Sequence, residues 1–390
     1  MVEFLAPGVF VEEVPGAPRP IEGVSTSTTA FIGAAERGQI NEPIKVQSFG
    51  EFERLFGGLA QGSALGFAVR QFFENGGTRA VIVRVAKRDG GAIGSAEVTA
   101  EVNRAARTGL YALDRAAFNL LCIPPYRPSS DLDVADWETA AQYCLQRRAF
   151  LIIDAPAAWT IEDAARKAAA FRLTARQNAA LYFPRIIAKN PFASGALTPH
   201  APCGVVAGII SRTDAARGAW KVPAGLEAVV KGAAGLSGHA NDAATERLTA
   251  SGVNALREFP GKGIVVWGAR TLASTDAASE WKYVPVRRLA LYLQESILRG
   301  THWAVFEPNN EKTWGRIRDQ VANFLNELFR RGALQGARPE QAFFVRCDAA
   351  TTTQSDIDNG RIILEIGFAP LKPAEFVVFR LQQIMQKPEP

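Results

Sequence analysis

Short, uninterrupted apolar runs alternate with helix-like stretches through the middle of the chain. The apolar runs are each long enough for one strand and cover residues 119–125, 149–156 and 179–186. Helical patterns cover residues 134–148, 161–175 and 202–218. Strands that are apolar on both faces and separated by helices are typical of a parallel sheet covered on both sides. The pattern therefore predicts a middle α/β domain.

The segment before this alternation has the same character. Residues 27–35 and 79–85 are apolar, strand-like runs. Two helical patterns between them end at the glycine pairs 57–58 and 76–77. Glycine is a common helix terminator because it adopts the left-handed conformation without strain. These elements are predicted to belong to the same α/β domain.

Two stretches of the middle region lack a strand or helix pattern. Residues 87–110 are small and polar, and they are predicted to form a surface excursion. Residues 224–250 are dominated by Ala and Gly, with few large apolar residues, and a long loop is predicted there. The middle α/β domain is accordingly assigned to residues 25–250.

The last third of the chain mixes strands and helices in a different order. Helical patterns cover residues 284–300 and 313–332, and the second has an apolar face formed by Trp314, Ile317, Val321, Phe324, Leu325 and Leu328. Strand-like segments cover residues 263–270, 342–348, 361–370 and, together with a turn, 301–310. Helices and strands are segregated here, which predicts a C-terminal α+β domain over residues 251–373.

Both ends of the chain carry extended apolar segments that the predicted domains do not absorb. Val9–Val14 lies among prolines, which favours an extended arm over residues 1–24. The alternation over residues 376–381 indicates a half-buried strand within a second arm, residues 374–390. An apolar strand without a partner is an aggregation hazard unless another chain pairs with it. Strand exchange between subunits is therefore predicted.

Composition and charge argue against several classes of protein. With 390 residues, 47% of them hydrophobic and 21% charged, the chain can bury a full core without disulfides or metal. The net charge of +5 is scattered without basic runs interleaved with aromatics, so no nucleic-acid binding is expected. No window is apolar over the roughly 18 residues of a membrane span, so no membrane insertion is expected.

The number and spacing of the cysteines indicate the cellular compartment in which the chain folds. Four cysteines are far apart and form no CxxC pair, which is typical of a reducing environment: Cys122, Cys144, Cys203 and Cys347. Cys122 and Cys347 lie in strand-like runs, where a free cysteine usually acts as a small buried hydrophobe. The N-terminus has no secretory signal pattern. We therefore expect synthesis in the cytoplasm and, if the protein works outside the cell, release by lysis.

Motifs for catalysis and metal binding are incomplete. No HExxH or HxH pattern includes any of the three histidines, His200, His239 and His302. The GLSGH run at 235–239 lacks the strand that precedes a nucleophile elbow. The FPGKGI run at 259–264 has Gly263 where a P-loop needs Ser or Thr for magnesium. We expect no cofactor, no metal site and no catalytic residues.

Asp154 needs separate consideration, because it ends a predicted buried strand where α/β enzymes often place catalytic acids. A hydrolase interpretation would pair Asp154 with His200, but no serine occupies a plausible elbow. A structural role, in which Asp154 caps a turn before Pro156, is favoured. A degenerate α/β hydrolase stays open as the alternative.

Several runs of sequence resemble those of contractile tail sheath proteins from phage tails, tailocins and extracellular injection systems. Near the start these runs are PGVFVEEVP, STSTTAFIGAAERG and SFGEFERLFGG. Towards the end they are FPGKGIVVWGARTL, WKYVPVRRLALYLQESI, GTHWAVFEPNNEKTW, FFVRCD, TTTQSDIDNGR and APLKPAEFVVFR, in that order. In the middle of the chain, the pattern of predicted elements resembles that family more than the individual residues do.

The resemblance implies a structural protein that is not an enzyme. Such a subunit polymerises helically around an inner tube and contracts to drive the tube through a target envelope. The implied partners are other copies of the chain, the inner tube protein, and baseplate and terminal cap proteins. The middle domain is implied to be subtilisin-like but non-catalytic. Synthesis in the bacterial cytoplasm is implied, and a baseplate component of the same particle is the other structural alternative.

The resemblance also implies roles for individual residues. Strands added to neighbouring subunits are implied to come from the two chain ends, with Val9, Phe10, Val11, Glu12, Val14, Phe376, Val377, Val378, Phe379, Arg380 and Leu381. The surface that faces the tube is expected on the outer side of the helix at 313–332, with Arg316, Arg318, Arg330 and Arg331. Strand addition supplies main-chain hydrogen bonds, and a head-to-tail contact that does not close builds an open helical array.

Overall fold

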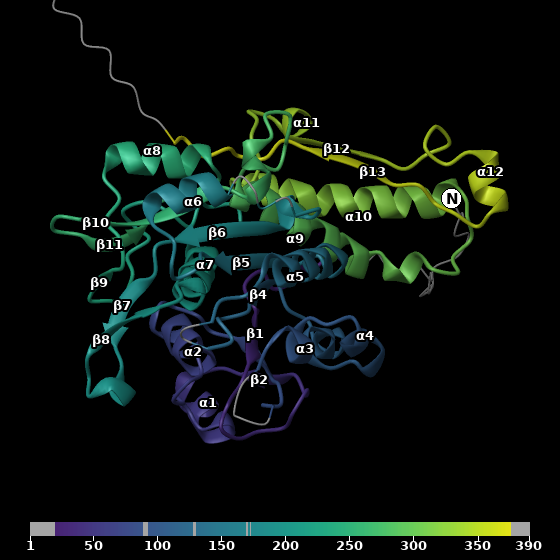
Figure 1. Cartoon of the computed structure of the whole chain (residues 1–390). Helices are drawn as coiled ribbons and strands as arrows, with labels where there is room; N and C mark the ends of the chain where they lie inside the picture. The colour runs from purple at the N-terminus through teal and green to yellow at the C-terminus, as the bar shows by residue number, and fades with distance from the viewer. Residues whose placement is uncertain (1–19, 89–92, 128–129, 169–170, 172, 376–390) are drawn as a thin grey trace, which may run out of the picture. The chain divides into compact units, whose positions relative to one another are not determined.

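A computed structural model describes residues 20–88, 93–127, 130–168, 171 and 173–375 (Figure 1). These residues divide into two compact units. Unit 1 comprises residues 20–23 and 296–369. Unit 2 comprises the described residues between 24 and 295, together with 370–375. The chain therefore passes from one unit to the other after Gly23, after Glu295 and after Ala369.

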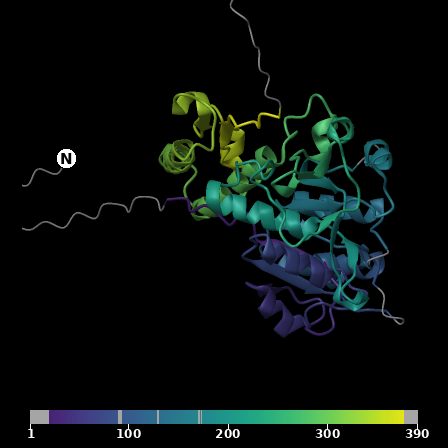
Figure 2. The same ribbon diagram turned by 90° about the vertical axis from the view of Figure 1, so that its left-hand side faces the viewer.

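Unit 2 is built on an eight-stranded sheet with the order β11-β10-β6-β5-β4-β1-β3-β2 (Figures 1 and 2). The inner strands pair in parallel, and the edge strands β2 and β11 run antiparallel to their neighbours. The strands are β1 (Thr29–Gly33), β2 (Ile44–Val46), β3 (Ala80–Arg84), β4 (Leu120–Cys122), β5 (Phe150–Asp154), β6 (Ala179–Phe183), β10 (Val253–Phe259) and β11 (Gly263–Val266).

Helices cover both faces of this sheet, because neighbouring residues of a strand point to opposite sides. Phe31 and Ile82 pack in one core with α1 (Phe49–Phe56), α2 (Leu65–Glu74) and α7 (Cys203–Arg217). Ile32 and Val81 pack in the other core, with α3 (Ser95–Val98), η1 (Gly109–Arg115), α5 (Val134–Gln146), α6 (Ile161–Ala168) and α8 (Asp242–Ala250). Helix α4 (Val102–Ala106) connects α3 to η1.

Helices α2 and α7 approach each other through glycine. A Cβ on Gly204 would lie 2.0 Å from the carbonyl oxygen of Ala68, and a Cβ on Gly208 would lie 2.5 Å from that of Phe72. No side chain fits in so short a gap, so the two backbones can only approach with glycine at both positions. This close contact fixes α7 against the sheet and thereby places the polar side chains that α7 carries.

Unit 2 also contains a three-stranded antiparallel sheet in the order β8-β7-β9. Its strands are β7 (Ile186–Lys189), β8 (Leu197–His200) and β9 (Gly235–Leu236). The connections of unit 2 include the short 3-10 helices η2 (Arg176–Asn178), η3 (Pro191–Ala193) and η4 (Leu272–Thr275). Helix α9 (Val284–Gly300) belongs to unit 2 over residues 284–295 and to unit 1 over residues 296–300.

Unit 1 is organised around the long helix α10 (Glu311–Arg330). Asn310 caps this helix by accepting a hydrogen bond from the backbone N–H of Thr313, as expected for an N-cap asparagine. The predicted apolar face of the helix is confirmed, since all six of its residues are buried. The other elements of unit 1 are η5 (His302–Ala304), α11 (Pro339–Ala342), β12 (Phe343–Arg346), α12 (Gln354–Asp358) and β13 (Glu365–Phe368).

The predicted mixed α/β architecture is confirmed, including the parallel sheet with helices on both faces. Two predicted loops nevertheless contain structure. The surface excursion predicted for 87–110 is wrong in part, because Val98 and Leu110 are fully buried. Their apolar side chains are too widely spaced among small polar residues to give a periodic signal. Within 224–250, β9 and α8 replace part of the predicted long loop.

Two further predictions need correction. The domain boundary expected at residue 251 does not coincide with the divisions of the structure, because β10 and β11 continue the sheet of unit 2. The strand expected within 301–310 is wrong, because these residues form η5 and a turn that leads into α10. The N-terminal stretch 9–14 and the strand expected at 376–381 lie outside the described residues.

Candidate assembly site

Strands β12 and β13 form a sheet of two strands in unit 1, within the part of the chain that the structure describes. The antiparallel register runs from Phe343 opposite Phe368 to Arg346 opposite Glu365. A two-stranded sheet has two outer edges whose main-chain N–H and C=O groups can pair with further strands. Phe344, on β12, is 48% exposed. This sheet, here called the β12–β13 sheet, is a candidate site for strand addition.

Two of the arginines expected to face a tube are engaged within unit 1. The guanidinium carbon of Arg316 lies 4.3 Å from the centre of the Trp303 ring, and Nη1 lies 3.7 Å from a carboxylate oxygen of Glu307. Arg318 donates a hydrogen bond of 3.2 Å to the carbonyl oxygen of Cys347. These side chains therefore brace the turn before α10 and the end of β12.

The other two candidates, Arg330 and Arg331, lie at the C-terminal end of α10 and are exposed. Positive charge at this end of a helix complements the partial negative charge of its last carbonyl groups. Both side chains are exposed, whereas those of Arg316 and Arg318 are half-buried.

The first described residues of the chain pack on unit 1. Ile21 is buried, and a Cβ on Gly300 would lie 2.6 Å from its Cγ1, so glycine there allows the isoleucine to pack against the end of α9. A hollow of about 320 Å³ beside Ile21 is lined by Pro20 and by α10 side chains that include Asp319 and Asn323. The segment that precedes residue 20 is thus attached to unit 1 at a fixed point.

The last described residue, Glu375, is held by unit 2. Arg270 donates from Nε to one carboxylate oxygen at 2.7 Å and from Nη2 to the other at 2.6 Å. The Tyr283 hydroxyl donates at 3.0 Å, and Lys282 Nζ lies 3.8 Å away. Burial opposes ionisation of Glu375, but the hydrogen bonds and charge of Arg270 outweigh it and lower the pKa of the carboxyl. We call this arrangement the Glu375 clamp.

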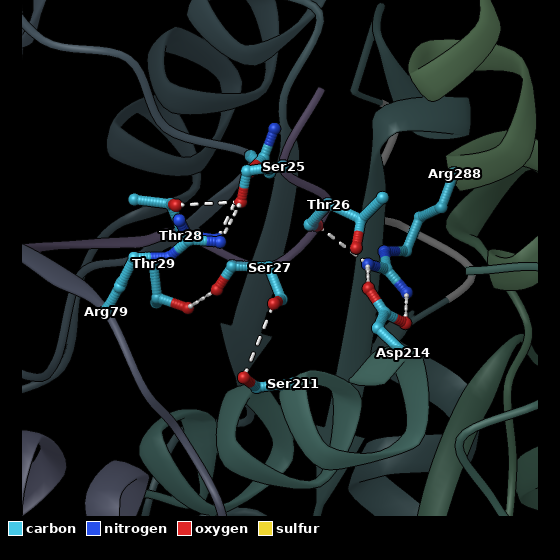
Figure 3. Close-up of polar contacts among 10 residues, drawn as sticks. Ser25, Thr26, Ser27, Thr28, Thr29, Arg79, Ser211, Asp214 and Arg288 are labelled. Carbon is cyan, nitrogen blue, oxygen red and sulfur yellow. Dashed lines mark hydrogen bonds and ion pairs between the residues drawn. The ribbon is translucent and has the colours of Figure 1, made fainter. Parts of the chain in front are cut away.

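A buried ion pair fixes the start of unit 2 (Figure 3). Arg288 of α9 binds both carboxylate oxygens of Asp214 on α7, and each of these side chains is 3% exposed. The same guanidinium donates a hydrogen bond of 2.8 Å to the carbonyl oxygen of Thr26. Arg288 thus ties two helices to the segment that enters unit 2 after Gly23.

Serine and threonine side chains hold the rest of this entering segment (Figure 3). Arg79 donates to the hydroxyl of Ser25 at 3.1 Å, and that hydroxyl lies 3.0 Å from the hydroxyl of Thr28. The hydroxyls of Ser27 and Ser211 lie 3.3 Å apart, which links the segment to α7. The serine and threonine run before β1 is therefore attached to the body of unit 2.

Asp154 and His200, the residues of the alternative hydrolase interpretation, are engaged with other partners. Oδ1 of Asp154 accepts a hydrogen bond of 2.7 Å from the backbone N–H of Cys203, the first residue of α7. Nε2 of His200 lies 3.0 Å from the hydroxyl of Thr198. The carboxylate of Asp154 therefore stabilises the positive end of α7, whereas the sequence suggested a cap for the turn before Pro156.

Burial opposes charge on both of these side chains. It raises the pKa of Asp154 to about 6, although the Cys203 hydrogen bond and the charge of Arg185 act in the opposite direction. Burial, together with the positive charges of Arg70 and Arg185, lowers the pKa of His200 to about 4. At neutral pH, His200 is accordingly neutral and Asp154 carries a charge at an energetic cost.

The substitution Asp154→Asn is expected to change the pH dependence of stability. Because folding raises the pKa of Asp154 from 3.8 to about 6, the native state holds the proton more tightly, and stability is lost as pH rises through this interval. The change corresponds to about 3 kcal/mol. Between pH 4 and pH 7, urea titrations should show the unfolding free energy of the unmodified chain falling by up to this amount relative to Asp154→Asn. Parallel pH profiles would contradict the assignment.

The other candidate motifs take structural positions. Within the run at 235–239, the first two residues form β9, and the backbone N–H of Ser237 donates to the carbonyl oxygen of Arg185. The run at 259–264 forms the turn between β10 and β11. His239 and His302 are exposed. Across the described ranges, no group of three or more His, Cys, Asp or Glu side chains is placed to hold a metal ion.

The four cysteines are buried and free. The thiol of Cys122 donates to the carbonyl oxygen of Cys203 at 3.6 Å, and burial raises the pKa of both thiols. The expectation that Cys122 and Cys347 are buried is confirmed. None of the helices described here has the length and apolarity needed to cross a membrane.

Sequence reasoning missed the residues that hold the two ends of the described chain. Ile21 was assigned to the extended arm over residues 1–24 although it is buried, and the partners of Glu375 lie far from it in sequence. No periodic signal marked the buried pair, because Arg288 lies off the apolar stripe of the helix at 284–300. The residues predicted to link subunits, within 9–14 and 376–381, lie outside the described part of the chain.

Comparison with known proteins extends over most of this chain. The family described as "Phage tail sheath protein central domain" matches residues 93–272, and the family described as "Phage tail sheath C-terminal domain" matches residues 276–384. The tail sheath protein of Vibrio phage KVP40 is 28% identical over 175 residues, which is 45% of this chain and 25% of that protein. The chain thus matches a quarter of the length of this curated relative.

Solved structures resemble the chain over nearly its whole length. The anti-feeding prophage helical sheath in the contracted state has a TM-score of 0.75 and 26% identity, and it covers 98% of this chain and 100% of its own. The sheath complex of the extracellular contractile injection system PVC, also in the contracted state, has a TM-score of 0.74 and 26% identity, with 98% and 99% covered.

Proposed function

Because this chain belongs to the contractile tail sheath family, we propose that it is a structural subunit that polymerises helically around an inner tube and contracts to drive the tube through a target envelope. The observation that carries this proposal is the likeness, over 98% of the chain, to a helical sheath in the contracted state. The proposal assigns no catalytic role to Asp154, which accepts a hydrogen bond from the first residue of α7, or to His200, which contacts the hydroxyl of Thr198.

Subunits are linked by strands that the chain ends add to the β12–β13 sheets of their neighbours. The proposed linking residues are Val9, Phe10, Val11, Glu12, Val14 and those at 376–381. Two observations support this link. The β12–β13 sheet has two edges that can accept strands, and one chain end leaves from unit 1 at Ile21 while the other leaves from unit 2 at Glu375. A neighbour bound through both ends is therefore connected to both units.

The middle region supplies a rigid body in this proposal. Its parallel sheet with a core on each face agrees with a subtilisin-like arrangement that has no catalytic role. The buried pair of Arg288 and Asp214 adds a polar contact inside this body. Rigid units joined by strand links can change their packing during contraction while the links persist.

The tube protein is the proposed partner of unit 1, and baseplate and cap proteins are the proposed partners at the sheath ends. The double substitution Arg330→Glu with Arg331→Glu is expected to lower co-sedimentation with tube protein several-fold, because it reverses exposed charge at the end of α10. Arg217→Glu, an exposed arginine in the last turn of α7, is the matched control. Unchanged co-sedimentation would remove this end of α10 from the tube interface.

Negative-stain electron microscopy of the purified chain tests the proposed function. Striated hollow cylinders are expected, either from the chain alone or after addition of its tube protein. A chain that stays monomeric with and without the tube protein would contradict the proposal. The proposal also includes synthesis of the chain in the bacterial cytoplasm and release of the assembled particle through lysis.

A further inference from the structure

Unit 2 contains a groove of about 680 Å³ beside the Glu375 clamp. Its apolar lining comes from several elements and includes Val222, Ala224, Ala250, Val253, Trp267 and Ala269. Polar side chains also line it, among them Asp242 on α8 and Arg257 on β10. Its volume lies within the range of about 300–1,000 Å³ that is typical of protein binding sites for small molecules, which have a similar mixture of apolar and polar lining.

The chain itself leads into this groove. Pro373, Ala374 and Glu375 belong to its lining, and the Glu375 clamp fixes them there through Arg270. The residues that follow Glu375 start at the groove. An extended chain advances by about 3.3–3.6 Å per residue, so the side chain of residue 379 can reach any point within about 14 Å of Glu375.

The segment after Glu375 has the composition that such a groove can hold. Residues 376–381 read FVVFRL, which places large apolar side chains close to a single arginine. In a free subunit, this segment would expose apolar surface and an unpaired strand, which favours aggregation. Glu246 of the lining can match the arginine of the segment, whereas Asp242 is already paired with Arg257 at 2.8 Å.

We propose that this groove holds residues 376–381 of the same chain while the subunit is free, and releases them when the β12–β13 sheet of a neighbour becomes available. The inference rests on the proposed function, because it concerns the strand that links subunits. The groove then acts as a storage site that limits premature association, and the Glu375 clamp keeps the start of the segment at the groove in both states.

The energies involved favour a weak, reversible storage site. Burying a Val or Phe side chain favours the stored state. Fixing the backbone of each residue opposes it by a similar amount. The two terms nearly cancel over a short segment, so the stored state is only marginally favoured. A neighbouring sheet edge adds main-chain hydrogen bonds that side chains in a groove do not supply, and it therefore displaces the segment from the groove.

An engineered disulfide tests where the segment lies. Phe379→Cys combined with Ala250→Cys places one thiol in the segment and one on the exposed end of α8, inside the groove lining. The four native cysteines are buried, so background oxidation is low. The matched control is Phe379→Cys with Ala243→Cys, because Ala243 is also exposed on α8 but is not among the groove-lining residues.

Mild oxidation of the dilute, full-length double variant should form a bond within one chain, identified by peptide mapping after non-reducing electrophoresis. Reduction should cleave the bond and restore the electrophoretic mobility of the unoxidised subunit. A bond formed equally well in the control, or no bond at all, would overturn the proposal. Bonds between chains would overturn it as well, and would assign the groove to the segment of a second copy.

A second experiment measures whether the Glu375 clamp anchors the segment at the groove. Glu375→Gln removes the charge that Arg270 and Lys282 hold, so disulfide formation in the double variant should slow several-fold. Glu258→Gln, which neutralises an exposed carboxylate on β10 outside the groove lining and the clamp, serves as the control. Equal rates in both backgrounds would exclude Glu375 as the anchor. Failure of the unmodified chain to form cylinders would instead contradict the proposed function, whatever the disulfide does.

Discussion

Removal of residues 1–20 is expected to leave a folded subunit that forms no cylinders. Unit 2 begins after Gly23 and keeps its sheet, its two cores and the Arg288–Asp214 pair in this variant. Ile21, which packs against Gly300, is also retained. The deletion removes only the strand that the N-terminal end is proposed to add to a neighbour, so the free energy of unfolding should change little while assembly is lost.

Two measurements separate folding from assembly in this deletion. Thermal unfolding followed by circular dichroism reports the fold, and electron microscopy with sedimentation reports the polymer. A milder variant is Val11→Pro in the full chain, because proline removes one main-chain donor from a strand, whereas Val11→Thr keeps the donor and serves as its control. Normal cylinders from the deletion would refute the linking role of the N-terminal end.

Arg288→Met is expected to lower the free energy of unfolding by about 3–5 kcal/mol. Methionine fills a similar volume but leaves the carboxylate of Asp214 buried without its guanidinium partner, and both side chains are only 3% exposed. The substitution also removes the hydrogen bond to the carbonyl oxygen of Thr26. The large effect comes from an unpaired buried charge rather than from lost attraction alone.

The double variant Arg288→Met with Asp214→Leu is the control for this prediction. Replacing both members of a buried ion pair by apolar residues is often close to neutral, so much of the stability should return. Urea denaturation of all variants at one pH measures the differences. A loss below about 1 kcal/mol for Arg288→Met would place the pair among ordinary surface ion pairs and contradict its buried role.

The sequence alone determined the local elements and the architecture they form. Apolar runs such as 149–156 predicted β5, and the stripe on 313–332 predicted α10, because a strand or helix shows its burial as a period in its own sequence. The distinctive runs of sequence towards both ends of the chain were enough to indicate the family. Both signals are local, and neither depends on which elements are neighbours in space.

The tertiary structure decided which distant residues meet. Arg288 binds Asp214 from 74 positions away, and Arg270 binds Glu375 from 105 positions away. These pairs depend on which helix lies against α9 and on where the chain returns after Ala369. No periodicity in the sequence indicates either arrangement. Val98 shows the same limit, since an isolated apolar residue is buried only because other elements close over it. Periodicity reports local burial, and the contacts proposed to serve assembly are non-local.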